Sequence, residues 1–319
     1  MKLQEIYDLA IQIGIDNDPR GRERVGKILE ERRQEYEELP AKKKAEYDVE
    51  NLTDPYSDSG FHFGDPETDI KTVLVGIDID PGEVLLAKEL ERQGKKIDLI
   101  IGHHPIGKAL IKLHEVMDMQ VDIMARYGIP ENIAEGVLSD RLSEVSRGVS
   151  PANHFQAIDA AKLLGIPVIN VHTPGDNSAW NYVTGYLEKK APETVGEIIE
   201  AIKEIPEYKE ASRLGIGPSI FAGREKSRAG KIVVDFTGGT SGSEKAYERM
   251  SHYGIGTIVS MHMHEKHREE AVKHYINVVI ASHMASDSLG LNIIMDELER
   301  RGVEIVPCSG FIRVSRNQQ

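Results

Sequence analysis

The stretch Asp98-Leu-Ile-Ile-Gly-His-His-Pro105 combines an apolar run with a pair of histidines. The apolar run is typical of a buried strand, and Pro105 ends that strand because proline cannot extend a hydrogen-bonded ladder. His103 and His104 therefore stand at the carboxyl end of the strand, where open α/β sheets collect ligands and metal ions. Taken alone, the pair still favours two hydrogen-bonded imidazoles at an ordinary strand end.

The segments around this strand predict alternating strands and helices. A strand at 72–78 and a helix at 81–93 precede it, which makes a βαβ unit and implies a parallel sheet. Further strands, most of them separated by helices, are predicted at 167–173, 231–236, 256–263, 277–281 and 303–307. The sequence therefore predicts an α/β protein with two similar lobes, each with a mainly parallel sheet, which face each other.

Changes in composition divide the chain into four segments. Residues 1–65 combine an amphipathic helix with a stretch dense in charged residues, and they are predicted to form a helical N-terminal extension. Residues 66–190 form the first α/β lobe, residues 191–228 a connecting segment, and residues 229–319 the second α/β lobe. Because no candidate ligand lies in the extension, a cap or an oligomer contact is favoured over a catalytic role for it.

Composition also excludes several functional classes. The net charge of −13 argues against a nucleic-acid partner, because phosphate contacts need clustered lysine and arginine. The only cysteine, Cys308, excludes an internal disulfide and a multi-cysteine metal site. No window approaches the ~20 apolar residues of a membrane span. The N-terminus has no apolar signal core, so we expect a cytoplasmic protein without a membrane partner.

Polar side chains gather at the ends of the other predicted strands as well. These side chains are His172 and Asp176, His262 and His264, and His283 and Asp287. With His103 and His104 included, at least six of the twelve histidines stand at the ends of predicted strands. A random distribution of histidines along the chain would not be expected to give this pattern. The pattern therefore favours a site for two metal ions over isolated hydrogen-bonded imidazoles.

The pair His283 and Asp287 is the sharpest local signal. If the last long helix begins near His283, both side chains share one helical face and can bind one cation. The alternative is a helix start in which Ser282 or Asp287 only caps the first turn. Asp176 follows a turn predicted at 174–175 and is a candidate metal ligand. His172 is favoured as a residue that hydrogen-bonds to a metal ligand, or as a proton shuttle.

Two further features carry weaker signals. His262 and His264 could share one face of an extended chain, where they would form an auxiliary site. The loop Thr237-Gly-Gly-Thr-Ser-Gly-Ser243 lies between a strand and a helix, where backbone amides can bind an anion. It lacks the Gly-Lys-Ser/Thr ending of a nucleotide P-loop, so an ordinary tight turn is the favoured interpretation.

The chain from about Thr72 to Val314 resembles the Nif-three-like family, also called dinuclear metal centre hexameric proteins, some of which are described as GTP cyclohydrolase I type 2-like. The matching motifs are Gly76-Ile-Asp78, Ile-Gly-His103-His104-Pro105, His172-Thr-Pro-Gly-Asp176 and Ser282-His283-Met-Ala-Ser-Asp287. The last of them corresponds to the family's Gly-His-x-x-x-Glu. The acid at this position is therefore one methylene shorter here.

The resemblance implies a site for two adjacent divalent metal ions and a toroidal homohexamer of two-lobed protomers. The implied ligands are His103, His104, Asp176, His283 and Asp287. Three imidazoles and two carboxylates suit Zn, Mn, Fe or Co, and two such ions can hold a bridging hydroxide at neutral pH. We therefore expect a metal-dependent hydrolase of a small-molecule substrate that the sequence does not identify, with His172 as its catalytic proton shuttle.

Two alternatives stay open. One is a metal-binding hexamer without catalytic activity that regulates or scaffolds partner proteins. The other is opening of a purine nucleotide ring, as in a GTP cyclohydrolase. An open coordination position would favour an enzyme, whereas saturated metal ions would favour a scaffold.

Overall fold

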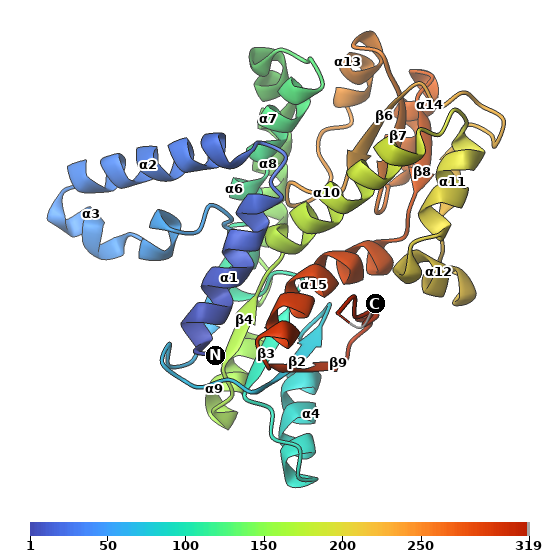
Figure 1. Ribbon diagram of the computed structural model, residues 1–319. Helices are drawn as coiled ribbons and strands as arrows, with labels where there is room; N and C mark the ends of the chain where they lie inside the picture. The colour runs from blue at the N-terminus through green and yellow to red at the C-terminus, as the bar shows by residue number, and fades with distance from the viewer. Residues whose placement is uncertain (318–319) are drawn as a thin grey trace.

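Two long helices, α10 (Thr173–Lys190) and α15 (His283–Arg300), cross between two α/β lobes in the computed structural model, which describes residues 1–317 (Figure 1). Their crossing is unusually close, because a Cβ atom added to Gly290 would overlap the backbone carbonyl of Gly175. Only glycine permits such an approach of two backbones. The crossing fixes where the first turns of both helices lie.

The first lobe contains a five-stranded sheet. In spatial order its strands are β1 (Gly60–Phe63), β4 (Val168–Asn170), β3 (Leu99–Gly102), β2 (Thr72–Gly76) and β9 (Glu304–Pro307). Only β1 runs antiparallel to its neighbour. Helices α4 (Pro81–Arg92) and α9 (Gln156–Leu164) cover one face, while α1 (Leu3–Asp16) and α15 cover the other. Strand β3 is buried on both faces, as expected for a central parallel strand.

The second lobe contains a four-stranded sheet. In spatial order its strands are β5 (Ser219–Ala222), β8 (Asn277–Ile280), β7 (Ile255–Ser260) and β6 (Lys231–Asp235), of which only β5 is antiparallel. One face packs against α10, α11 (Val195–Lys203) and α12 (Pro206–Arg213). The other face packs against α13 (Ala246–His252) and α14 (Glu265–Lys273). The predicted fold class of two α/β lobes with mainly parallel sheets is confirmed.

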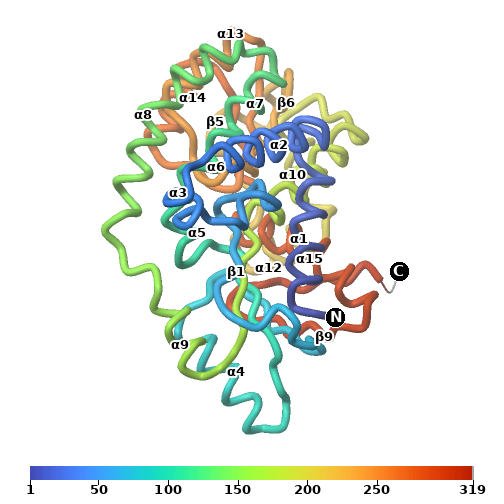
Figure 2. Tube along the Cα trace, turned by 90° about the vertical axis from the view of Figure 1, so that its left-hand side faces the viewer, coloured from blue at the N-terminus to red at the C-terminus, as the bar shows by residue number. Residues whose placement is uncertain are grey.

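A helical insertion follows β3 and reaches the second lobe. Its helices are α5 (Gly107–Ile111), α6 (Leu113–Val116), α7 (Met119–Arg126) and α8 (Glu131–Val149). Figure 2 shows α8 running from the neighbourhood of α9 toward α13 and α14. Ala246 of α13 belongs to the apolar cluster of this insertion, so the insertion packs directly on the second lobe.

The first 65 residues pack into the first lobe rather than beside it. Their helices are α1, α2 (Arg22–Glu38), α3 (Ala41–Glu46) and the short 3-10 helix η1 (Val49–Leu52). Leu3, Ile6 and Tyr7 of α1 are buried in the same cluster as the sheet residues Val73 and Leu99. Strand β1 also comes from this segment. The predicted helices are present, and the segment additionally supplies core side chains and an edge strand.

Two local expectations differ from the structure. The turn predicted at 174–175 is wrong, because Pro174 lies in the first turn of α10, where its missing N–H costs no intrahelical hydrogen bond. Strand β9 lies at the edge of the first sheet, although residues 229–319 were assigned to the second lobe. The reason is that α15 carries the chain back across the molecule. Within residues 1–317, no helix has both the length and the apolar character to span a membrane.

Candidate metal centre

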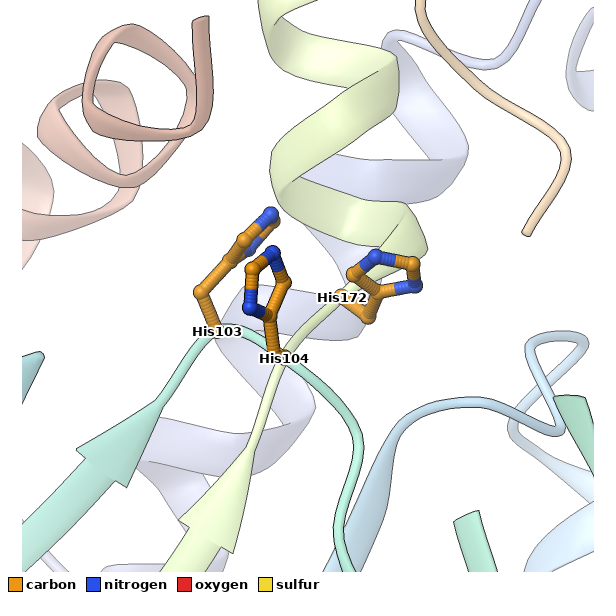
Figure 3. Close-up of side chains that lie close together, drawn as sticks. All are labelled: His103, His104 and His172. Atoms are coloured by element: carbon orange, nitrogen blue, oxygen red, sulfur yellow. The ribbon is translucent and has the colours of Figure 1, made fainter. Parts of the chain in front are cut away.

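Six of the eight side chains singled out at the strand ends lie together where the two lobes meet. His103 and His104 follow β3, and Figure 3 shows their rings close to that of His172 at the start of α10. Asp176 lies in the first turn of α10. His283 begins α15 and Asp287 follows one turn later on the same face, as the i, i+4 spacing predicted.

Asp287 lies at the centre of this group. Its Oδ1 atom is 3.5 Å from Nε2 of His103. Its Oδ2 atom is 3.5 Å from Nε2 of His104 and 3.6 Å from Nε2 of His283. On the other side of His103, Nε2 lies 3.3 Å from Oδ1 of Asp176. The two carboxylates and three imidazoles thus direct their donor atoms toward one another.

These separations fit a divalent cation better than direct hydrogen bonds. Two ligands at ~2.1 Å from a tetrahedral metal ion stand ~3.4 Å apart. His103 Nε2, Asp176 Oδ1 and both Asp287 oxygens are also buried without a hydrogen-bond partner among residues 1–317. Buried polar atoms normally have a hydrogen-bond partner. Several buried polar atoms that lack one and face one another therefore mark a site for a ligand or an ion. The donor set therefore fits a metal ion.

Three groups of these side chains could each hold a cation. The groups are His103 with Asp176 and Asp287, His104 with His283 and Asp287, and His103 with His104 and His172. In each group, the ligand atoms lie within 4.8 Å of one another. His262 and His264 belong to none of the groups found in the described part of the chain.

In three of the clustered histidines, His103, His104 and His172, the second ring nitrogen has its own acceptor. The Nδ1 atom of His103 donates to the carbonyl oxygen of Val171 at 3.2 Å. His104 Nδ1 donates to Oδ1 of Asp78 at 2.7 Å, and His172 Nδ1 donates to Oδ2 of Asp58 at 2.7 Å. Such acceptors fix the tautomer of metal-binding histidines and leave Nε2 with its lone pair toward the metal.

Sequence reasoning did not select Asp58 and Asp78 as site residues. Asp78 follows β2, next to the strand that carries the histidine pair, so its position at a strand end was a usable signal. Asp58 is fully buried, and Thr173 also donates to it at 2.7 Å. It lies in the segment 1–65, which no local pattern connects to His172.

Charge coupling in the centre is strong. Burial alone would lower the pKa of His103, but the carboxylates of Asp287 and Asp176 outweigh burial and raise it to about 10. Burial likewise opposes the charge of His104, whose pKa Asp287 and Asp78 raise to about 9. For Asp287, burial favours the neutral acid, but His103 and His104 hold its pKa well below the usual range. A divalent cation bound at neutral pH therefore displaces imidazole protons.

The centre opens into a cleft between the lobes. The opposite wall includes His262, whose ring centroid lies 4.9 Å from that of His283, and the loop 237–241. The side-chain amide of Gln120 donates to the carbonyl oxygens of Gly238 and Thr240 and holds this loop in place. The loop is thus part of the cleft that leads to the centre.

The fold and the site define a class of protein: a two-lobed α/β protein with a histidine and aspartate centre that could hold metal between the lobes. The chain is similar to a NIF3 superfamily protein from Sphaerobacter thermophilus, with 30% sequence identity and a TM-score of 0.70 over 80% of this chain and 91% of that chain. The chain belongs to the NIF3 superfamily, as the sequence motifs predicted.

A more distant similarity extends the comparison of folds. Reduced HcgD from Methanocaldococcus jannaschii has 16% identity and a TM-score of 0.51, over 84% of this chain and 97% of that chain. At this identity the likeness concerns the fold alone. No protein-family model matches the sequence, and no curated protein matches it.

Proposed function

We propose that the chain holds two divalent cations, drawn from Zn, Mn, Fe and Co, and hydrolyses a small-molecule substrate. The observation that carries this proposal is the position of Asp287. Its Oδ1 faces His103 and its Oδ2 faces His104 and His283, so its two oxygens would serve separate cations if two were bound. When bound, two cations supply Lewis acidity and an activated water at neutral pH. The proposed ligands are His103, His104, Asp176, His283 and Asp287.

His172 is the proposed proton-transfer residue. Its Nε2 atom lies 3.7 Å from Oδ2 of Asp176 at the edge of the cluster, and the side chain lines the cleft. Asp58 holds Nδ1 and stabilises the imidazolium that forms when Nε2 accepts a proton. His172 can therefore accept a proton from the attacking water and return it to the leaving group, as a general base and then a general acid.

The cleft favours an enzyme over the metal-binding scaffold. A purely structural site would be closed on all sides, whereas this centre borders a cleft that is lined by side chains of both lobes. The homohexamer, the cytoplasmic location and the alternative of purine ring opening stay predictions.

Replacing His172 with glutamine tests the proposed role. We expect His172→Gln to keep its metal content and to lose about a hundredfold or more in turnover, because general acid–base catalysis contributes on this scale. Turnover is measured on a panel of chromogenic phosphate and carboxylate esters with each of the four metals. The exposed His252→Gln is the matched control and should leave turnover unchanged.

Two outcomes would contradict this assignment. Loss of metal from His172→Gln would make His172 a ligand instead. Full metal occupancy of the parent protein with no metal-dependent turnover on any ester would favour the non-catalytic alternative.

A further inference from the structure

A second pocket continues from the metal cleft. It lies between α7 of the helical insertion and the inner side of the second lobe, where β6, β7 and α13 form its wall. The two spaces share Asp235, Thr237, Ser241, Ser260 and His262 as lining residues. A molecule with one end at the metal centre can therefore extend into this pocket.

Much of the pocket wall is apolar and rich in methionine. Its lining includes Met124, Tyr127, Val233, Tyr247, Met250 and Met263. Methionine side chains adapt their shape and make favourable contacts between sulfur and aromatic rings. Aromatic side chains such as Tyr247 prefer ring partners. These walls suit a flat ring better than a charged or strongly hydrated group.

Asp235 supplies a polar acceptor at the junction of the two spaces. Asp235 is exposed and lines both spaces, and the protein atoms packed around its carboxyl group raise its pKa to about 6. The Ser260 hydroxyl donates to the backbone carbonyl of Asp235. In the chain from residue 1 to residue 317, no lysine, arginine or histidine forms a salt bridge with the carboxylate of Asp235. The carboxylate is thus free to accept from a ligand in the cleft.

We propose that this pocket binds an aromatic or heteroaromatic ring of the substrate, with an N–H group of that ring donating to Asp235. The polar end of the same molecule then reaches the metal centre, a part of the inference that rests on the proposed function. Ring binding itself does not depend on catalysis, so it can be measured separately.

Indole and benzofuran form a matched pair of probes for the pocket. The two molecules have the same shape, but only indole carries an N–H donor, and neither has a nitrogen lone pair that binds metals. We expect the metal-loaded protein to bind indole about tenfold more tightly than benzofuran, since hydrogen bonds to charged groups are worth this much. Ligand-observed NMR titrations give both dissociation constants.

Three variants locate the binding. Asp235→Leu should bind the two probes equally, because the acceptor is gone and the apolar walls remain. Ala246→Phe places a ring in the pocket and should abolish binding of both probes, and Met250→Trp serves the same purpose if Ala246→Phe does not fold. Ala45→Phe, on the exposed side of α3, is the matched control and should bind as the parent does.

Metal content is measured on every variant. Absence of bound metal can then be distinguished from absence of probe binding in the pocket. Equal affinity of the parent for both probes would overturn the role of Asp235. Unchanged probe binding in a folded Ala246→Phe or Met250→Trp variant would overturn the pocket itself.

Discussion

Asp287→Asn is expected to weaken binding of divalent cations by about a hundredfold, at the upper end of the losses seen when groups around a metal are removed. The substitution keeps the size of the side chain but removes its charge and one of its two acceptor oxygens. Both oxygens face imidazole nitrogens at 3.5 to 3.6 Å, and the residue is only 1% exposed. Competition with a chromogenic chelator measures the affinity.

Asp287→Glu is the companion variant. Asp287 already reaches its neighbours from α15, so the longer side chain should keep metal binding with some loss of affinity from crowding. Asp140 lies on the exposed face of α8, so Asp140→Asn is the control and should not change metal binding. The cap role that the sequence left open does not apply, because α15 begins at His283 with Ser282 as its N-cap. Unchanged affinity in Asp287→Asn would remove the residue from the site.

Gly290→Ala is expected to destabilise the protein by about 3 kcal/mol, the upper range for overpacking a tight contact. The added methyl group would overlap the backbone carbonyl of Gly175, and a backbone atom cannot move aside as a flexible side chain can. Helices α10 and α15 would separate, and they carry Asp176 and Asp287. Denaturant unfolding of the metal-free protein measures the loss of stability, and a chelator titration should show weaker metal binding.

Gly185→Ala provides the matched control on α10. A Cβ atom at Gly185 meets no atom within 4 Å. Alanine is the better helix former by up to about 1 kcal/mol, so this variant should be as stable as the parent or slightly more stable. If the two substitutions changed stability equally, the close crossing would not hold the two helices together.

The sequence predicted those features that local patterns determine. Some features of the fold depend only on nearby residues. Examples are the strand that the apolar run before Gly102 forms and Pro105 ends, and the helical face that His283 and Asp287 share. These patterns placed the strand ends and the type of sheet, and they brought the polar side chains that follow the strands to notice, whereas the proposed set of ligands came from the family resemblance. The family resemblance is confirmed by the comparison with a solved structure.

The features that the sequence did not reveal depend on contacts between distant segments. Asp58 reaches His172 only because β1 pairs with β4. Strand β9 joins the first sheet because α15 spans both lobes. The apolar pocket has one wall from α7 and another from β6 and α13, so no single stretch of sequence carries its pattern.

Elemental analysis of the protein after reloading with metal tests the central claim most directly. The separate positions of the two Asp287 oxygens predict close to two divalent cations per chain. Protein purified without a chelator should approach the same ratio. A ratio below about half an ion per chain after reloading would contradict the two-cation centre, because a preformed set of ligands that releases its imidazole protons to the solvent on binding should retain the metal.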